Sequence, residues 1–361
     1  MSIQLARELR VFLTNNIDNA GIVDLNGLNQ NNTVELVIQS DSFTAQQSRS
    51  YDYVDLGNLL ESNLKTDAAV KTNQDIGTMS FVTLLSSSKT GPVDLRLWNA
   101  LLYEVPYPND SWEIATTYLK TPLVRTTALP RPFGIILALD KSLYVYDACR
   151  VSGVSLNFDL SNLANCSWTL QYEQLRIVSG TKITENKTIY SITGTVTGTV
   201  LKNKNREYKY ANPGLVKVSV YDSALAKLGT LASTGLSLNI TNTLNYIPDN
   251  NIDRTGLSQL FAGAGSYSVT GSVSFYTRAP GTFTGTFINS LLDSAQLTTD
   301  PIFRGYGIEL PLTKTKNLCE IFLPHCSTIL NTEFSQVLTN TADFKMTDSQ
   351  YINNSYIKFT T

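Results

Sequence analysis

The sequence predicts a mainly β protein, in which a β-sandwich or half-barrel domain with one short flanking α-helix occurs twice in tandem. Three observations predict this fold. Apolar and small polar residues alternate in many segments, helical spacing is confined to short pieces, and several segments recur about half a chain length apart. The 361 residues are 42% hydrophobic and 16% charged, which is enough apolar material for sizeable cores.

Alternation is clearest over 154–160, where Val154, Leu156 and Phe158 share one face and Ser155, Asn157 and Asp159 share the other. Strands with one apolar and one small polar face are typical of antiparallel sheets that are wetted on one side. The other segments that indicate strands are 191–201, 217–221, 236–240 and 268–276.

Helical spacing of apolar residues occurs in three short segments, 56–65, 95–102 and 287–292. In 95–102, for example, Leu95, Trp98 and Leu102 fall on one stripe. Short amphipathic helices of this kind usually bury their apolar stripe against a neighbouring element. We therefore expect each to pack against the edge of a sheet.

Three pairs of segments recur in the same order. Residues 77–83 match 271–277 at an offset of 194, and 96–102 match 286–292 at an offset of 190. Residues 157–174 match 333–350 at an offset of 176, which aligns Trp168 with Phe344. The pattern predicts two equivalent domains, residues 1–178 and 179–361, with Phe81 and Phe275 on equivalent strands. The alternative is two unrelated β domains of similar composition.

Chemical motifs are scarce. The only histidine, His325, precedes Cys326, and adjacent residues of a strand point to opposite faces, so the two cannot cooperate there. Metal-ligand spacings and phosphate-binding glycine loops are missing from the sequence, so no catalytic residue, metal or cofactor is expected. A carboxylate pair assembled across the fold would be invisible at this level. The four cysteines are expected to be free and buried.

Charge and hydropathy narrow the class of protein further. A net charge of −2 and a pI near 5.6 argue against a protein that wraps nucleic acid. The sequence contains no run of eighteen apolar residues, so no membrane-spanning helix is expected. The first ten residues lack the features of a secretory signal.

Several segments resemble the tail tube proteins of T-five-type siphophages. They are residues 1–7 with 11–14, residues 79–83 with 97–101, residues 147–149 continuing through 154–159 to 167–168, and residues 269–276. The resemblance implies two tube domains in one chain, three chains in a ring of pseudo-six-fold symmetry, and rings stacked into a hollow tail. Some members of that group also carry an immunoglobulin-like domain at the C-terminus, and we expect none here because the sequence stops about ten residues after the second repeat.

The resemblance further implies a virion protein that is assembled in the host bacterial cytoplasm and does not contact a membrane. Its partners would be further copies of itself and the tape measure, tail tip and terminator proteins. DNA would pass through the tube without being bound.

We expect the small polar strand faces to line the lumen of such a tube, because a polar, non-basic wall does not hold phosphates. The candidate lumen residues are Ser155, Asn157, Asp159, Thr270, Ser272 and Ser274. Their alternative role is an ordinary solvent face.

Contacts between subunits or rings are expected at two long polar excursions, 41–73 and 236–260. They are also expected between an acidic cluster over 35–75 and a basic cluster over 202–209, whose charges are complementary. Their alternatives are a hairpin folded on its own domain and ordinary solvated loops. The candidate contact residues are Asp41, Tyr51, Tyr53, Asp55, Leu59, Glu61, Tyr246, Lys202, Lys204 and Arg206.

Two other classes of function compete with a tail tube subunit. One is a different virion or secretion-system ring, tube or decoration protein. The other is a carbohydrate-binding β-sandwich or a hydrolase on such a scaffold. The first predicts self-assembly without a ligand, whereas the second predicts a monomer with an aromatic-lined pocket.

Overall fold

A computed structural model describes most of the chain, and all structural statements below concern the residues it describes. These are residues 9–28, 32–47, 49–54, 68–88, 91–92, 94–102, 119–121, 132–139, 142–160, 162–179, 182–183, 189–191, 194–195, 209–212, 216–222, 224–231, 233–248, 259–276, 282–289, 302–314, 316–333, 339–347 and 355–359.

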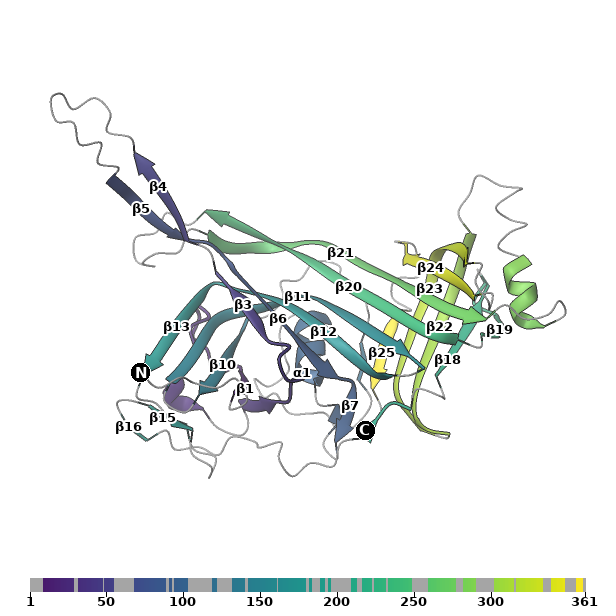
Figure 1. The fold of residues 1–361 in the computed structure, drawn as a ribbon, viewed down its shortest axis with the longest axis horizontal. Helices are drawn as coiled ribbons and strands as arrows, with labels where there is room; N and C mark the ends of the chain where they lie inside the picture. Colours follow the sequence, from purple (N-terminus) through teal and green to yellow (C-terminus); the bar gives the residue numbers. More distant parts are fainter. Residues whose placement is uncertain are drawn as a thin grey trace.

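The mainly β class is confirmed, and one extended antiparallel sheet forms the body of the molecule (Figure 1). Its strands are β1 (Arg10–Thr14), β2 (Thr33–Leu36), β3 (Thr44–Gln46), β6 (Gly77–Leu84), β9 (Leu119–Thr121), β10 (Phe133–Leu139), β11 (Ser142–Asp159), β12 (Asn162–Tyr172), β13 (Gln174–Ser179), β18 (Lys217–Tyr221), β19 (Lys227–Leu231), β20 (Ser233–Pro248), β21 (Gln259–Tyr276), β22 (Ile302–Thr313), β23 (Lys316–Glu333), β24 (Thr339–Met346) and β25 (Tyr356–Phe359).

Smaller elements lie around this sheet. They are the hairpin β4 (Arg49–Val54) and β5 (Ala68–Gln74), the three-stranded sheet of β7 (Ser86–Ser88), β8 (Gly91–Pro92) and β17 (Lys209–Tyr210), and the three-stranded sheet of β14 (Lys182–Ile183), β15 (Ile189–Ser191) and β16 (Gly194–Thr195). The helices are the 3₁₀ turn η2 (Leu25–Gly27), α1 (Leu95–Leu102) and a helical segment over 283–289.

The halves of the chain share one sheet, because β11 pairs with β20 along seven residue pairs, from Gly153 opposite Thr241 to Asp159 opposite Gly235. The pairing order across this junction is β3, β6, β12, β11, β20, β21, β24, β23, β22, β18 and β19. The first part of β11 turns away and pairs with β10 and β13 instead. One apolar core runs beneath both halves.

Each half shows the same order of strand pairing. In the first half the order is β2, β1, β10, β11, β12, β6, β3, and in the second it is β19, β18, β22, β23, β24, β21, β20. Phe81 on β6 and Phe275 on β21 therefore occupy corresponding strands. Descent from one duplicated domain stays a prediction, because unrelated antiparallel sheets can reach the same order.

The alignment of the third repeated segment was wrong by four residues. Strand β6 places Gly77 opposite Tyr172, and β21 places the matching Gly271 opposite Phe344. Phe344 therefore corresponds to Tyr172, not to Trp168. The shift escaped detection because β12 is buried at every second position, so moving it by four residues preserves the pattern of faces.

Other expectations about local structure also need correction. Residues 236–260 are not a loop excursion, because they contain most of β20 and the start of β21, a long hairpin within the sheet. The alternation that predicted a strand over 236–240 continues through Asn242 and Leu244, which are both buried. The first excursion contains β3, β4 and β5, and the helix expected over 56–65 lies outside the described residues. The helix expected over 287–292 begins earlier, at residue 283.

Helix α1 buries its apolar stripe as predicted, but it packs on the buried face of the sheet and not against the edge where it was expected. The ring of Trp98 meets that of Trp168 edge-on, with centroids 5.1 Å apart. Asp94 precedes the helix, is fully buried, and accepts a hydrogen bond from Thr83 Oγ1 at 3.1 Å. The indole of Trp168 donates to the same hydroxyl at 2.9 Å. Helix and sheet are thus joined by a buried polar chain.

Candidate assembly surfaces

One face of the large sheet is polar across the junction between the halves, and we call it the polar wall. Antiparallel register places side chains that face one another on the same side of a sheet, so rows can be followed from strand to strand. One such row is Ser167, Ser155, Asn239, Thr270 and Lys345, and the next is Asn165, Asn157, Ser237, Ser272 and Asp343. The six candidate lumen residues thus lie on one continuous surface, although they come from different halves.

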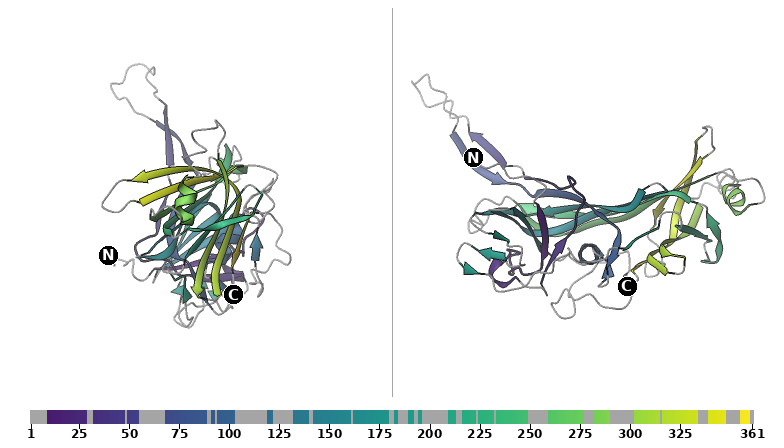
Figure 2. Two further views of the ribbon diagram at one scale, coloured as in Figure 1. Left: turned by 90° about the vertical axis from the view of Figure 1, so that its right-hand side faces the viewer. Right: turned by 60° about the horizontal axis from the view of Figure 1, so that its bottom comes forward.

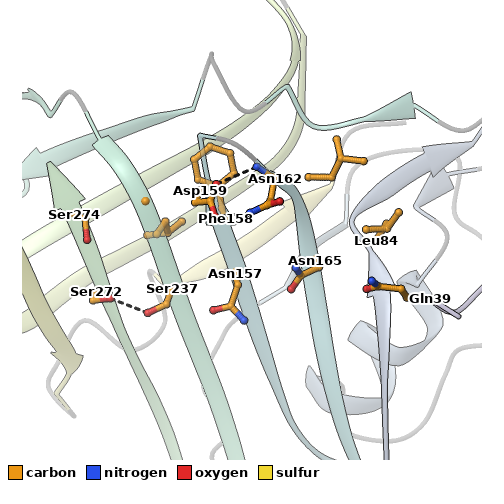
Figure 3. A pocket seen from close by; sticks show the side chains of 13 residues that line it. Gln39, Leu84, Asn157, Phe158, Asp159, Asn162, Asn165, Ser237, Ser272 and Ser274 are labelled. Atoms are coloured by element: carbon orange, nitrogen blue, oxygen red, sulfur yellow. Dashed lines mark hydrogen bonds between the residues drawn. The ribbon is translucent and has the colours of Figure 1, made fainter. Parts of the chain in front are cut away.

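Hydroxyl and amide groups bond across neighbouring strands of the polar wall. The hydroxyl oxygens of Ser237 and Ser272 lie 2.8 Å apart (Figure 3). Those of Thr241 and Ser268 lie 2.7 Å apart. At the turn between β11 and β12, Asp159 accepts bonds from the backbone and the side-chain amide of Asn162. Such bonds give the polar side chains of the wall partners within the sheet itself.

The other face of these strands is the apolar core. Leu156, Leu238 and Val273 lie on successive strands and are each at most 1% exposed. Because the core occupies this side, the alternating polar residues must point the other way. The strict alternation in the sequence therefore fixes which surface the polar wall presents.

The polar wall carries few charges. Over residues 77–84, 153–159, 162–171, 235–241, 268–276 and 339–345, the only charged residues are Asp159, Asp343 and Lys345. A surface with two carboxylates and one ammonium group attracts no polyanion, since DNA affinity depends on neutralising several phosphates. An open hollow on this wall is lined by Asn157, Asn165, Ser237 and Ser272, with Leu84 and Gln39 at one side (Figure 3).

Sequence reasoning missed the polar residues contributed by β12, β20 and β24. Asn165, Ser167, Ser237, Asn239 and Thr341 lie in the same rows as the expected residues. The alternation in 162–171 and 339–345 was a usable signal. What the sequence did not reveal was which strands are neighbours.

The second surface is the hairpin of β4 and β5, which projects away from the body of the molecule (Figures 1 and 2). Tyr51 and Tyr53 lie on β4, opposite Thr72 and Ala69. Asp41 is exposed in the turn before β3 and has a φ of 60°, a left-handed conformation that aspartate tolerates better than most residues.

Tyr246 belongs to another hairpin, on β20 opposite Phe261, and burial raises the pKa of its phenol. Asp55, Leu59, Glu61, Lys202, Lys204 and Arg206 lie outside the described residues. One member of the acidic cluster is already paired within the chain, since Arg10 Nε lies 2.8 Å from Glu35 Oε1.

Groups with chemical reactivity are buried or engaged. All four cysteines are free and buried, as expected, and burial raises the pKa of the Cys326 thiol to about 12. His325 Nδ1 lies 3.1 Å from Thr347 Oγ1. Within the described residues no three His, Cys, Asp or Glu side chains gather closely enough to bind a metal ion, and no helix there has the length and apolarity to cross a membrane.

The mainly β fold and its continuous polar wall favour the class of structural proteins. The chain belongs to the phage tail tube protein family, whose sequence profile matches residues 23–300. Members of this family are structural proteins of the virion, so the resemblance seen in the sequence is confirmed.

One curated protein and one solved structure show similarity to parts of the chain. The chain is 22% identical to the tail tube protein pb6 of Escherichia phage T5 over 294 residues, which are 76% of this chain. The chain spans 58% of the length of that relative. A cryo-EM structure of the anti-feeding prophage baseplate is similar with a TM-score of 0.30 and 12% identity, covering 50% of this chain and 97% of the other.

Proposed function

We propose that three copies of this chain close a ring of pseudo-six-fold symmetry, and that the rings stack into a tube whose lumen is lined by the polar wall and conducts DNA during ejection. One observation carries the proposal: a polar, nearly uncharged sheet face that runs without a break across both halves. A curved sheet with one face buried becomes the wall of a barrel when neighbouring copies extend it.

The chemistry of the wall suits transit of DNA. A basic lumen would bind phosphates and release counterions, and the duplex would then be held by each ring in turn. Small neutral side chains, with Asp159 and Asp343 as the carboxylates, avoid this. The proposal assigns to the candidate lumen residues the role that the sequence predicted for them.

In this proposal, residues 1–178 and 179–361 supply alternate positions of the pseudo-six-fold ring. The acidic segment with Asp41, Asp55, Leu59 and Glu61, and the basic segment with Lys202, Lys204 and Arg206, form contacts between chains or between rings. The tape measure, tail tip and terminator proteins are the heterologous partners. Assembly takes place in the host bacterial cytoplasm.

Negative-stain electron microscopy of the purified protein tests the assembly. Rings or tubes of uniform bore, formed without any added ligand, are the expected result. A protein that stays monomeric at high concentration, across a range of salt and pH, would contradict the proposal.

Cysteine labelling tests which face lines the lumen, because the four native cysteines are buried. A Ser272→Cys variant should react with a bulky polyethylene glycol maleimide as a monomer and become protected in tubes. The control is Asn26→Cys, at an exposed position in η2, which is not part of the polar wall and should react in both states. Equal labelling of Ser272→Cys in both states would place the polar wall outside the lumen.

A further inference from the structure

The second half of the chain contains a long hairpin that pairs with a strand of the first half. Strands β20 and β21 form it, and β20 adds to β11 of the first half through the pairs from Gly153–Thr241 to Asp159–Gly235. Within one chain, therefore, the hairpin of one half extends the sheet of the other. The pairing of β20 with β11 therefore serves as a template for a junction between two neighbouring domains.

The first half contains a corresponding hairpin without such a contact. Strand β3 pairs with β6 as β20 pairs with β21: Thr44 faces Ser80, and Gly235 faces the matching Ser274. Strands β4 and β5 continue this hairpin outward, just as β20 and β21 continue theirs. Among the described strands, β3 pairs only with β6, and its three residues are all exposed.

The second half contains the corresponding acceptor edge. Gly153 of β11 faces Thr169 of β12, which in turn faces Ser80 of β6. In the same way, Asn331 of β23 faces Thr341 of β24, which in turn faces Ser274 of β21. Asn331 is thus the counterpart of Gly153. Strand β22 pairs with β23 only as far as Thr328, so beyond it the described strands leave this edge of β23 open. Ile329 is 68% exposed there.

The geometry points to a specific junction between copies: β4 of one chain adds antiparallel to the edge of β23, at residues 329–333, of the next chain. This inference rests on the proposed function and names the contact that closes its ring. Thr241 lies six residues after Gly235, and Ser50 lies six residues after Thr44. The register of the β11–β20 junction therefore places Ser50 of one chain opposite Asn331 of its neighbour.

Two physical arguments support this junction. Open strand edges pair readily with other strands, so a protein that leaves two of them must cover them or aggregate. The projecting hairpin and the open edge of β23 lie at opposite ends of the molecule (Figure 1). Such a head-to-tail contact repeats from copy to copy and forms a ring when the rotation closes.

A disulfide between copies tests the register. In tubes of the Ser50→Cys/Asn331→Cys variant, mild oxidation should link each chain to the next and give covalent dimers and trimers on a non-reducing gel. Residues that face one another in an antiparallel pair have Cα atoms about 4.5–5.5 Å apart, which is within the range that a disulfide spans. The two cysteines of a single chain are at opposite ends and cannot react with each other.

Two variants control this measurement. Ser155→Cys/Asn239→Cys places cysteines opposite each other in the β11–β20 junction and should form a bond within the chain. Ser50→Cys/Leu228→Cys moves the second cysteine to β19, another edge strand, where Leu228 is 45% exposed. This pair should give no covalent trimers.

Hydrogen exchange on the unaltered protein gives a second test that needs no cysteine. On assembly, amides in 49–54 and 329–333 should exchange at least about tenfold more slowly, because new ladder bonds must open first. Tubes without this protection, or without the Ser50–Asn331 link, would overturn the junction and leave the proposed function intact. Failure of the unaltered protein to form rings would overturn both.

Discussion

Gly271 lies directly beneath the ring of Phe344, and a Cβ atom placed on this glycine would stand 2.5 Å from both the Cζ atom of that ring and the carbonyl oxygen of Ser237. Gly77 and Tyr172 show the same relationship on β6 and β12, with the tyrosine ring filling the space of the missing side chain. Each glycine thus lets an aromatic ring of the neighbouring strand lie flat on the sheet.

The Gly271→Ala substitution should therefore destabilise the protein by about 1–3 kcal/mol, since the added methyl group meets a backbone oxygen that cannot move aside easily. The measurement is urea unfolding of the soluble protein. Gly235→Ala is the matched control on the paired strand, because its Cβ would meet nothing closer than 3.5 Å. Equal losses in the two variants would contradict this account of the ring packing.

Thr83→Val should cost about 1–3 kcal/mol of stability, because it removes the hydroxyl that both Trp168 and Asp94 use and leaves two buried polar groups unpaired. Thr83→Ser keeps the hydroxyl and should lose clearly less. The measurement is again chemical denaturation. If the serine variant were as unstable as the valine variant, the loss would come from packing and not from hydrogen bonds.

Asp94 should make stability depend on pH in mildly acidic solution. Burial raises the pKa of its carboxyl from 3.8 to about 6, so the folded protein holds this proton more tightly than the unfolded chain does. The contribution of Asp94 to the free energy of unfolding is therefore largest below about pH 4 and declines as the pH rises to about 6. Asp94→Asn should remove this slope, so the stability difference between variant and unaltered protein should change by about 2–3 kcal/mol over that range. Parallel pH profiles would contradict the assignment.

Arg176→Lys should destabilise the first half more than a like-charge replacement usually does. The guanidinium bonds both carboxylate oxygens of the buried Asp147, and its Nη2 also donates to the carbonyl of Val23 at 2.9 Å. An ammonium group lacks the planar fork needed to reach all three acceptors, so we expect a loss of about 2 kcal/mol. Arg10→Lys, at a pair with a single bond to Glu35, should lose under about 1 kcal/mol. Thermal denaturation compares the two, and equal shifts would argue against the fork geometry.

Ser272→Lys should turn an inert lumen into one that binds DNA. The substitution adds one ammonium group per chain to a row that otherwise contains no cation, so tubes should gain affinity for short duplexes that falls steeply with salt. Fluorescence anisotropy of labelled duplexes measures it, with tubes of the Ser272→Asn variant as the neutral control. Tight binding by the unaltered tubes would contradict the neutral-wall argument.

Much of this architecture could be predicted from local patterns. Alternation over 154–160 and 268–276 gave the strands and the direction in which Ser155 and Ser272 point, because a strand repeats every two residues and burial fixes one face. The helix over 95–102 followed from the spacing of Leu95, Trp98 and Leu102. These features depend on neighbours in the sequence.

Pairing between distant strands could not be predicted in the same way. The junction of β11 with β20 depends on which buried faces meet, and many apolar strands of this chain would satisfy that requirement equally. The four-residue error at Phe344 has the same origin, since a shift by an even number leaves every side chain on its original face. The close packing of Phe344 on Gly271 decides the register, and that contact exists only in three dimensions.

The junction of β11 with β20 also determines when the chain can finish folding. Three of the strands that pair with β11, namely β10, β12 and β13, lie close to it in the sequence. The fourth, β20, is synthesised only after the segments that contain β14 to β19. Contacts between residues far apart in sequence slow folding, because the loop between them must be closed first. On the ribosome the edge of β11 therefore stays unpaired while those segments emerge, and this nascent first half is the species that host chaperones would have to protect from aggregation.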